Sequence, residues 1–204
     1  SRTLEALNRI NTPYVMLLLE DYFLSKKIEK KKITKIESFL LSNDIRYLRL
    51  VEIPKSKTKS KSSIIPILSC EEYGINLQAS IWKNTFLKSI LMEIKCGSAW
   101  DFEIYLLKKV ESSNKNALEG CFTLKNNVFG FHNAVLKGKW FRRELKYYRK
   151  KGIIIDYSKR GKLSFFEEKK FVIAQFLKRH LSVSARKRLK KMLRRFGFKF
   201  VSDV

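Results

Sequence analysis

Helix-type and strand-type hydrophobic patterns alternate over the first quarter of the chain, and this alternation limits the fold more than any other feature of the sequence. The pattern is helical over residues 2–10, strand-like over 14–19, helical again over 31–44 and strand-like over 46–53. Pro13 ends the first helix. The order helix, strand, helix, strand predicts an α/β fold in which parallel strands form a sheet flanked by helices.

Glycine and capping residues mark the ends of the later elements. Gly97 ends one helix, and Ser98 with Asp101 three residues on has the form of a capping box, which places Trp100, Asp101 and Glu103 in the first turn of the next helix. Over the rest of the chain we expect a strand at 73–82, helices at 83–94 and 97–110, a strand at 131–140, a basic helix at 141–152 that Gly152 ends, and helices at about 164–180 and 182–196.

Positive charge is concentrated in the last third of the chain. Lys and Arg number 44 against 19 Asp and Glu, which gives a net charge of +25. Residues 1–136 carry a net charge of +7 and residues 137–204 a net charge of +18. A surface this basic favours a phosphate-rich partner, whether nucleic acid, phospholipid headgroups or a nucleotide sugar. The lysine-rich and serine-rich run at 55–63 is a solvated loop or, alternatively, a phosphate clamp.

Cysteine usage and apolar run lengths exclude two other classes. The three cysteines form no CxxC pair and only two histidines accompany them, so a structural zinc site is disfavoured and a reducing cytoplasm is favoured. The longest apolar run is far shorter than the roughly 20 residues that cross a bilayer. With 45% apolar residues the chain has enough material for a core.

The last helical segment combines an apolar side with a strongly basic one. Over 181–196, leucines, Met192 and Phe196 fall broadly on one side, and seven Lys and Arg lie largely around the other. This pattern predicts an interfacial helix that binds an anionic membrane surface, to which each basic residue adds about 1 kcal/mol. A nucleic-acid-binding tail would have nearly the same composition. A helix docked on its own domain is the third alternative.

Two adjacent carboxylates follow the most hydrophobic strand. Glu20 and Asp21 come directly after the apolar run at 14–19, so the strand delivers them to the carboxyl edge of the sheet, where open α/β folds bind ligands. Carboxylate oxygens suit a divalent cation such as Mg²⁺ or Mn²⁺ and leave coordination positions free for a diphosphate. A strand end followed by an ordinary loop is the alternative.

A second acidic cluster lies between aromatic residues. Asp101 and Glu103 alternate with Trp100 and Phe102, and an aromatic wall can raise the pKa of a carboxyl group and prepare it as a general base. The helix dipole alone also favours carboxylates in a first turn. The three tryptophans at 82, 100 and 140 lie at element boundaries, where a flat ring either stacks on a sugar or anchors the edge of the core.

Four segments in order resemble a known family. They are TPYVMLLLEDYFL, INLQASIWKNTFLKSIL, GSAWDFEI and NAVLKGKWFRREL. Together they are similar to bacterial glycosyltransferase-like proteins of surface-polysaccharide clusters, related to the large inverting family with the GT-A fold. The similarity covers residues 1 to about 152. It implies a partial GT-A-like (Rossmann-like) mixed sheet flanked by helices over 1–152, followed by a basic amphipathic helical tail over 153–204.

The resemblance also implies roles for individual residues. Glu20 and Asp21 would hold the metal and the diphosphate of a nucleotide-sugar donor. Glu103 first, and Asp101 second, would be the catalytic base that deprotonates the acceptor hydroxyl. The acceptor would contact Gln78, Trp82 and Trp100, and the donor phosphates would contact Lys137 and Lys139, with His132 as an additional ligand.

Two departures from the family pattern shape the expectation. The adjacent Glu20–Asp21 pair replaces a spaced Asp-x-Asp, and the nucleotide-binding half that opens this fold is expected to be missing, so that the chain is a fragment or an inactive truncated relative. We expect a cytoplasmic glycosyltransferase, peripheral on the inner face of the cell membrane, that transfers a sugar to a surface-polysaccharide or lipid-linked glycan acceptor. The alternatives are a non-catalytic basic nucleic-acid-binding protein and an inactive membrane-associated relative.

Overall fold

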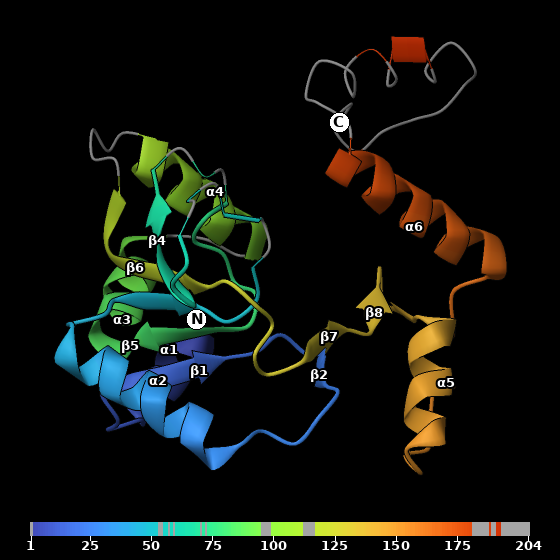
Figure 1. Ribbon diagram of the computed structural model, residues 1–204, viewed down its shortest axis with the longest axis horizontal. Coiled ribbons are helices and arrows are strands. Elements are labelled where there is room, and N and C mark those ends of the chain that lie inside the picture. Colours follow the sequence, from blue (N-terminus) through green and yellow to red (C-terminus); the bar gives the residue numbers. More distant parts are fainter. Residues whose placement is uncertain are drawn as a thin grey trace. The chain divides into compact units, whose positions relative to one another are not determined.

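The computed structural model describes residues 2–52, 55–56, 58, 60–69, 71, 73–94, 99–111, 117–180, 188 and 191–192 (Figure 1). The chain divides into two compact units, Ser1–Asn133 and Ala134–Val204. The boundary expected at residue 152 lies inside the second unit. Among the described residues, no helix has both the length and the apolar character needed to cross a membrane.

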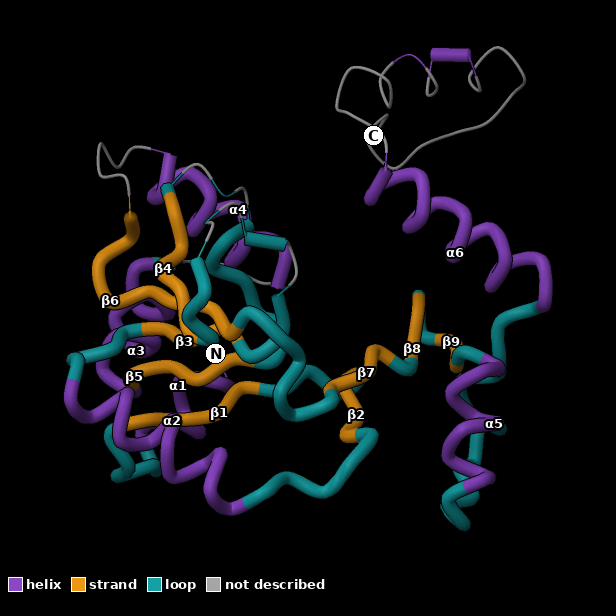
Figure 2. Tube along the Cα trace, in the orientation of Figure 1, coloured by secondary structure: helices purple, strands orange, loops and turns teal. Residues whose placement is uncertain are grey.

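A five-stranded mixed sheet forms the centre of the first unit. Its strands are β1 (Tyr14–Leu17), β3 (Tyr47–Arg49), β4 (Ile64–Leu68), β5 (Ser80–Lys83) and β6 (Ala117–Leu124), in the order β1-β5-β3-β6-β4 (Figure 2). The β3–β6 pair is parallel and the other neighbours are antiparallel. As predicted, the fold is α/β with a mixed sheet flanked by helices. The first two strands that were predicted, β1 and β3, run in the same direction. They are not neighbours in the sheet, because β5 lies between them.

Helices cover both faces of this sheet. The described helices of the unit are α1 (Arg2–Asn8), α2 (Lys30–Ser42), α3 (Asn84–Glu93) and α4 (Ala99–Glu111). Side chains of α1, α3 and α4 form one core cluster with Tyr47 and Trp82, whereas α2 forms the other with Leu48 and Ile81. Neighbouring residues of a strand point to opposite faces, so each of β3 and β5 contributes to both clusters. The helices predicted over 31–44, 83–94 and 97–110 are therefore confirmed, although Ser98 of the predicted capping box lies outside the described residues.

Two strands of the main sheet, β4 and β6, were not predicted from the sequence, although β6 lies in the interior of the sheet. β6 pairs with both β3 and β4, and β4 lies at the edge. Pro66 interrupts β4, which is compatible with an edge strand because proline has no N–H to donate. Conversely, only the last part of the strand predicted over 73–82, from Ser80, is a strand. The residues before it form turns that side-chain hydrogen bonds hold in place.

Cys121 on β6 is buried, and burial raises the pKa of its thiol to about 12. At pH 8 the thiolate fraction is then about 10³-fold lower than that of an exposed cysteine, whose pKa lies near 8.5. We therefore expect Cys121 to resist alkylation by iodoacetamide in the folded protein and to react readily in guanidinium chloride, as measured by peptide mass spectrometry. Rapid native labelling at Cys121 would contradict this placement of β6.

A small antiparallel pair extends from the carboxyl side of β1. β2 (Tyr22–Leu24) pairs with β7 (Phe131–Asn133), so that Phe23 lies opposite His132. The Ser25 hydroxyl donates to the Gly130 carbonyl at 2.7 Å and fixes the end of this pair. The segment directly after Glu20 and Asp21 is thus held by a strand from late in the unit.

In its described part, the second unit contains a β-hairpin followed by two helices. The hairpin strands are β8 (Val135–Leu136) and β9 (Lys139–Trp140), and the helices are α5 (Arg142–Lys150) and α6 (Phe165–His180). Lys137 and Gly138 form the two-residue turn, both with positive φ, which is the geometry of a type I′ hairpin. The strand predicted over 131–140 is therefore divided among three short strands.

The ends of the two helices are fixed by local bonds. Gly152 adopts a φ of 77°, and its N–H and that of Ile153 bond back to the carbonyls of Arg149 and Tyr148, which confirms the predicted end of α5. Ser164 and Glu167 form a reciprocal capping box at the start of α6. Most of the helix predicted at 182–196 lies outside the described residues; Arg188, Lys191 and Met192 are helical.

Candidate functional site

The carboxyl ends of β1, β3 and β6 meet at one edge of the main sheet, because these three strands run in the same direction. After β1, the chain turns between Leu19 and Tyr22, whose N–H donates to the Leu19 carbonyl at 3.1 Å. Glu20 and Asp21 are the two central residues of this turn. Glu20 is exposed and Asp21 is half-buried, so the structure separates the two carboxylates that the sequence places side by side.

Tyr22 connects Asp21 to a residue far away in the sequence. The pKa of the Tyr22 phenol is raised, first by its burial and then by the negative charges of Asp21 and Glu103. Both carboxylates therefore lie close enough to Tyr22 to act on its hydroxyl. The fold thus brings together the two acidic positions that the sequence analysis selected independently, one after β1 and one in α4.

Glu103 and Asp101 have different environments in α4. The Glu103 carboxylate is half-buried, and its Oε1 accepts a hydrogen bond from the Leu77 backbone N–H at 3.3 Å. Asp101 is exposed in the first turn, and Glu103 lies one position beyond that turn rather than within it as expected. The Leu77 N–H holds Glu103 against the segment that leads into β5, and Glu103 is half-buried whereas Asp101 is exposed, which favours Glu103 as the base. The side chain of Trp100 lies outside the described part of the structure.

The segment before β5 is fixed by Asn76. The Tyr47 hydroxyl donates to the Asn76 carbonyl at 3.1 Å and accepts from the Asn76 N–H at 3.2 Å, while Asn76 Oδ1 accepts from the Gln78 N–H at 3.0 Å. Asn76 is therefore structural. The Gln78 side chain projects from this fixed segment, and within the described part of the chain no donor reaches its buried Oε1. An unbonded buried oxygen costs about 1–3 kcal/mol, so this atom is a candidate acceptor for a ligand hydroxyl.

Trp82 belongs to the core. None of its surface is exposed, and its ring packs against Tyr47, Phe86 and Phe102 with centroid distances of 4.5, 6.1 and 6.0 Å. Its indole N–H donates to the Ser80 hydroxyl at 2.8 Å. A direct contact between this ring and an acceptor sugar would require Trp82 to leave its cluster. In this structure Trp82 instead supports Phe102, the neighbour of Glu103.

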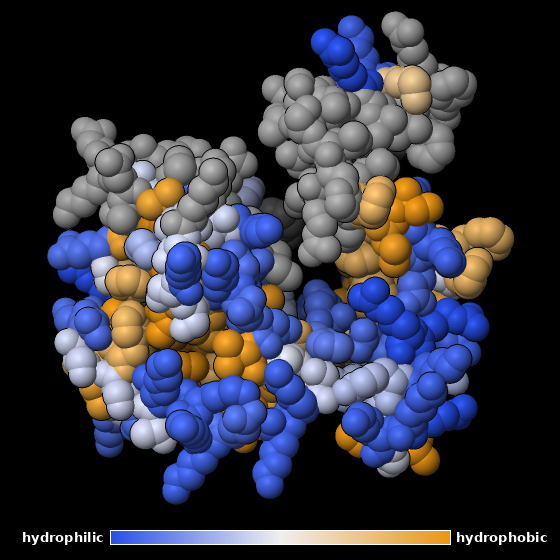
Figure 3. Space-filling model, viewed as in Figure 1, coloured by the Kyte–Doolittle hydropathy of each residue, from blue (hydrophilic) through white to orange (hydrophobic). Residues whose placement is uncertain are grey.

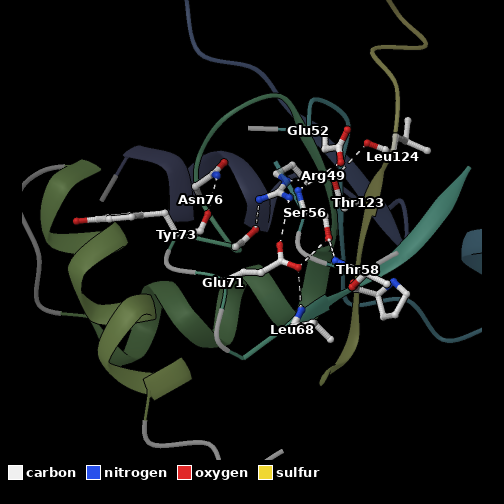
Figure 4. A network of polar contacts seen from close by, with 12 residues as sticks. Arg49, Glu52, Ser56, Thr58, Leu68, Glu71, Tyr73, Asn76, Thr123 and Leu124 are labelled. Atoms are coloured by element: carbon white, nitrogen blue, oxygen red, sulfur yellow. Dashed lines mark hydrogen bonds and ion pairs between the residues drawn. The ribbon is translucent and has the colours of Figure 1, made fainter. Parts of the chain in front are cut away.

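A buried ion pair that the sequence analysis did not identify lies at the carboxyl end of β3 (Figure 4). Arg49 is fully buried; its Nε donates to Thr123 Oγ1 at 3.1 Å and its Nη1 to the Gly74 carbonyl at 2.9 Å. Its Nη2 lies 3.7 Å from Glu71 Oε2, and Ser56 donates to the other Glu71 oxygen at 2.8 Å. Burial lowers the pKa of Arg49. The signal available in the sequence was an arginine within the apolar strand YLRLV.

This ion pair fixes the backbone that carries the candidate site. Arg49 holds the Gly74 carbonyl, two residues before Asn76, and thereby connects β3 and β6 to the segment that presents Gln78 and contacts Glu103. The Arg49 side chain is fully buried, its Nε and Nη1 donate to protein oxygens, and its Nη2 lies next to the Glu71 carboxylate. We therefore assign Arg49 a structural role.

The remaining predicted positions lie on the β2–β7 pair and in the second unit. His132 lies on β7, opposite Phe23 of β2. Lys137 and Lys139 belong to the β8–β9 hairpin of the second unit, where Lys139 Nζ lies 3.1 Å from Glu167 Oε1. Their contacts with donor phosphates stay a prediction.

Over the described ranges, no three His, Cys, Asp or Glu side chains gather in a group that could hold a metal ion. Mg²⁺ and Mn²⁺ at phosphate sites commonly use one or two carboxylates together with phosphate oxygens and water. Asp21, half-buried at the strand end, fits the place of such a single carboxylate ligand.

The sequence itself matches no protein-family model, and no curated protein is significantly similar to it.

Proposed function

We propose that the first unit is the catalytic part of an inverting glycosyltransferase of GT-A-like fold. It would transfer a sugar from a nucleotide-diphosphate donor to a hydroxyl of a surface-polysaccharide or lipid-linked glycan. One observation carries the proposal: the half-buried Glu103 carboxylate, held by the Leu77 N–H, lies with Asp21 around Tyr22 at the carboxyl edge of the sheet. The sequence resemblance to glycosyltransferase-like proteins supports the reaction class.

In the proposed reaction Glu103 is the general base. It removes the proton from an acceptor hydroxyl as the hydroxyl oxygen forms a bond to the anomeric carbon of the donor sugar. The bond between that carbon and the phosphate oxygen breaks on the opposite face, and the electron pair leaves with the nucleotide diphosphate. A divalent cation bound at Asp21 would neutralise charge on the leaving diphosphate. The Leu77 N–H holds Glu103 in position, and Gln78 Oε1 would accept a hydrogen bond from a second acceptor hydroxyl.

The proposal is tested first by nucleotide binding. Replacing Asp21 with Asn keeps the size of the side chain but removes its charge. We expect manganese to strengthen binding of a nucleotide diphosphate to the wild-type chain, and Asp21→Asn to weaken the manganese-dependent binding by about 10–100-fold. Isothermal titration calorimetry of the longest natural chain, with and without manganese, measures both effects.

Glu20→Gln is the matched control, since Glu20 is the exposed neighbour in the same turn. It should keep most of the manganese effect. Equal affinity of the wild type with and without the metal would contradict the role of Asp21.

Nucleic-acid binding is the second candidate function. The observation in its favour is the net charge of +18 over residues 137–204. Binding through phosphate neutralisation would fall steeply with salt and would not involve Glu103 or Asp21. An inactive relative, the third candidate, would bind the nucleotide diphosphate without turnover.

A further inference from the structure

Helix α6 exposes a continuous apolar face. Five side chains along it are open to solvent, among them Phe166 at 82%, Phe176 at 60%, Phe165 at 58% and Ile173 at 57%. With a helical rotation of 100° per residue they fall within about one third of the helix circumference. Figure 3 shows apolar side chains gathered along this helix. We call this surface the α6 apolar face; its residues are Phe165, Phe166, Val172, Ile173 and Phe176.

The opposite side of α6 is the one that packs on its own unit. The Phe171 ring lies 5.2 Å from the Phe141 ring, and the Glu168 carboxylate accepts hydrogen bonds from the Arg142 and Arg143 N–H groups at the start of α5. Glu167 pairs with Lys139. Several polar and aromatic contacts of the helix are therefore made on this side, while the side chains of the apolar face are exposed.

Basic residues accompany the apolar face. Lys169 lies within it, with its ammonium 5.4 Å from the centre of the Phe165 ring, and Lys170 follows. In the same unit, Ile154 is 88% exposed directly after the basic end of α5. The unit thus combines exposed aromatic and aliphatic side chains with a net charge of +18. The exposed apolar side chains indicate a partner with a hydrocarbon phase in which they can be buried. The positive charge of the unit indicates that the partner's surface is anionic.

We propose that the α6 apolar face binds the interfacial region of an anionic lipid bilayer, with the helix lying in the plane of the membrane. The aromatic and aliphatic side chains would enter the boundary between headgroups and acyl chains, and the surrounding lysines would contact lipid phosphates. A second copy of the chain is a poorer occupant because two units of this charge repel each other. Nucleic acid offers phosphates but no apolar phase for Phe166 or Phe176.

This surface differs from the one the sequence predicts. Membrane binding was predicted for 181–196, a segment of which only Arg188, Lys191 and Met192 are described, whereas the α6 apolar face lies before that segment. The inference goes beyond the proposed function, because binding to a bilayer requires neither a donor nor a base. Its test uses no enzymatic activity, so that its failure and the failure of the glycosyltransferase proposal are distinguishable.

Vesicle flotation of the full chain tests the proposal. The vesicles contain phosphatidylglycerol and phosphatidylcholine, or phosphatidylcholine alone. The triple variant Phe166→Ser, Ile173→Ser and Phe176→Ser keeps every charge but removes most of the apolar face. We expect it to lower the partition coefficient on anionic vesicles by about 100-fold or more, at roughly tenfold per side chain. Wild-type binding should be much weaker on phosphatidylcholine alone.

The control variant removes exposed apolar side chains from the first unit. Leu41 and Met92 are 61% and 66% exposed on α2 and α3, and Leu41→Ser with Met92→Ser should leave vesicle binding unchanged. Circular dichroism confirms that each variant is folded. As a second readout, Phe166→Trp should be quenched by lipids brominated near the headgroup end of their chains, whereas Met92→Trp should not.

Three results would overturn the proposal. The first is a folded triple variant that floats with anionic vesicles as well as the wild type does. The second is vesicle binding that 0.5 M salt abolishes equally for the wild type and the triple variant, if the wild type also binds duplex DNA or RNA tightly at physiological salt. The third is sedimentation that shows a wild-type dimer and a monomeric triple variant.

Discussion

Replacing Glu103 with Gln is expected to lower sugar transfer by about 10²–10⁴-fold while donor binding is retained. The amide has the size of the carboxylate, and its oxygen can still accept the hydrogen bond from the Leu77 N–H, so the position of α4 is kept. Only the ability to take a proton is lost. The measurement is nucleotide diphosphate release from a panel of nucleotide-diphosphate sugars, combined with calorimetry of donor binding.

Asp101→Asn is the matched control for this prediction. Asp101 precedes Glu103 by two residues in the same helix but is exposed, so its amide variant should keep most of the activity. An inactive Asp101→Asn beside a fully active Glu103→Gln would reverse the assignment of the base. Full activity of both variants would place the catalytic base elsewhere, and nucleotide binding by a wild-type chain without turnover would identify it as an inactive relative.

Replacing Arg49 with Met is expected to lower the free energy of unfolding by about 3–5 kcal/mol, because removing one member of a buried ion pair leaves the other charge buried. Methionine fills much of the same volume but cannot pair with Glu71 or donate to Thr123 and Gly74. Urea denaturation followed by circular dichroism measures the loss.

A double variant and a surface control sharpen this test. Glu71→Gln added to Arg49→Met removes the orphaned charge yet keeps an oxygen for the Ser56 hydroxyl, so it should recover part of the lost stability. Lys83→Met breaks an ion pair to Asp44 whose side chains are 35% and 74% exposed, and it should cost less than about 1 kcal/mol. A loss no larger for Arg49→Met than for Lys83→Met would contradict the buried pair.

The stability of this pair also concerns the site. Arg49 holds the segment that presents Gln78 and contacts Glu103. The double variant lacks Arg49, so it can recover stability without restoring the position of this segment. The two effects are separated by measuring activity at a temperature where each variant is fully folded.

Local sequence patterns determined the helices and the first strands. The apolar spacing at 31–44 and 83–94 predicts α2 and α3, and Gly152 predicts the end of α5, because each signal lies within a few residues and needs no distant partner. These features could be predicted because the chain satisfies them locally.

The tertiary structure decided the strand order and the composition of the site. β6 lies in the interior of the sheet only because β3 and β4 both pair with it, and no local signal encodes that pairing. Trp82 is part of the core rather than a stacking surface for a sugar, because its ring packs against those of Tyr47, Phe86 and Phe102. Glu103 and Asp101 have similar sequence neighbourhoods, and they differ in the fold because Glu103 is half-buried and bonded to the Leu77 N–H, whereas Asp101 is exposed. Each of these outcomes depends on contacts between residues far apart in the chain, which periodicity and composition do not contain.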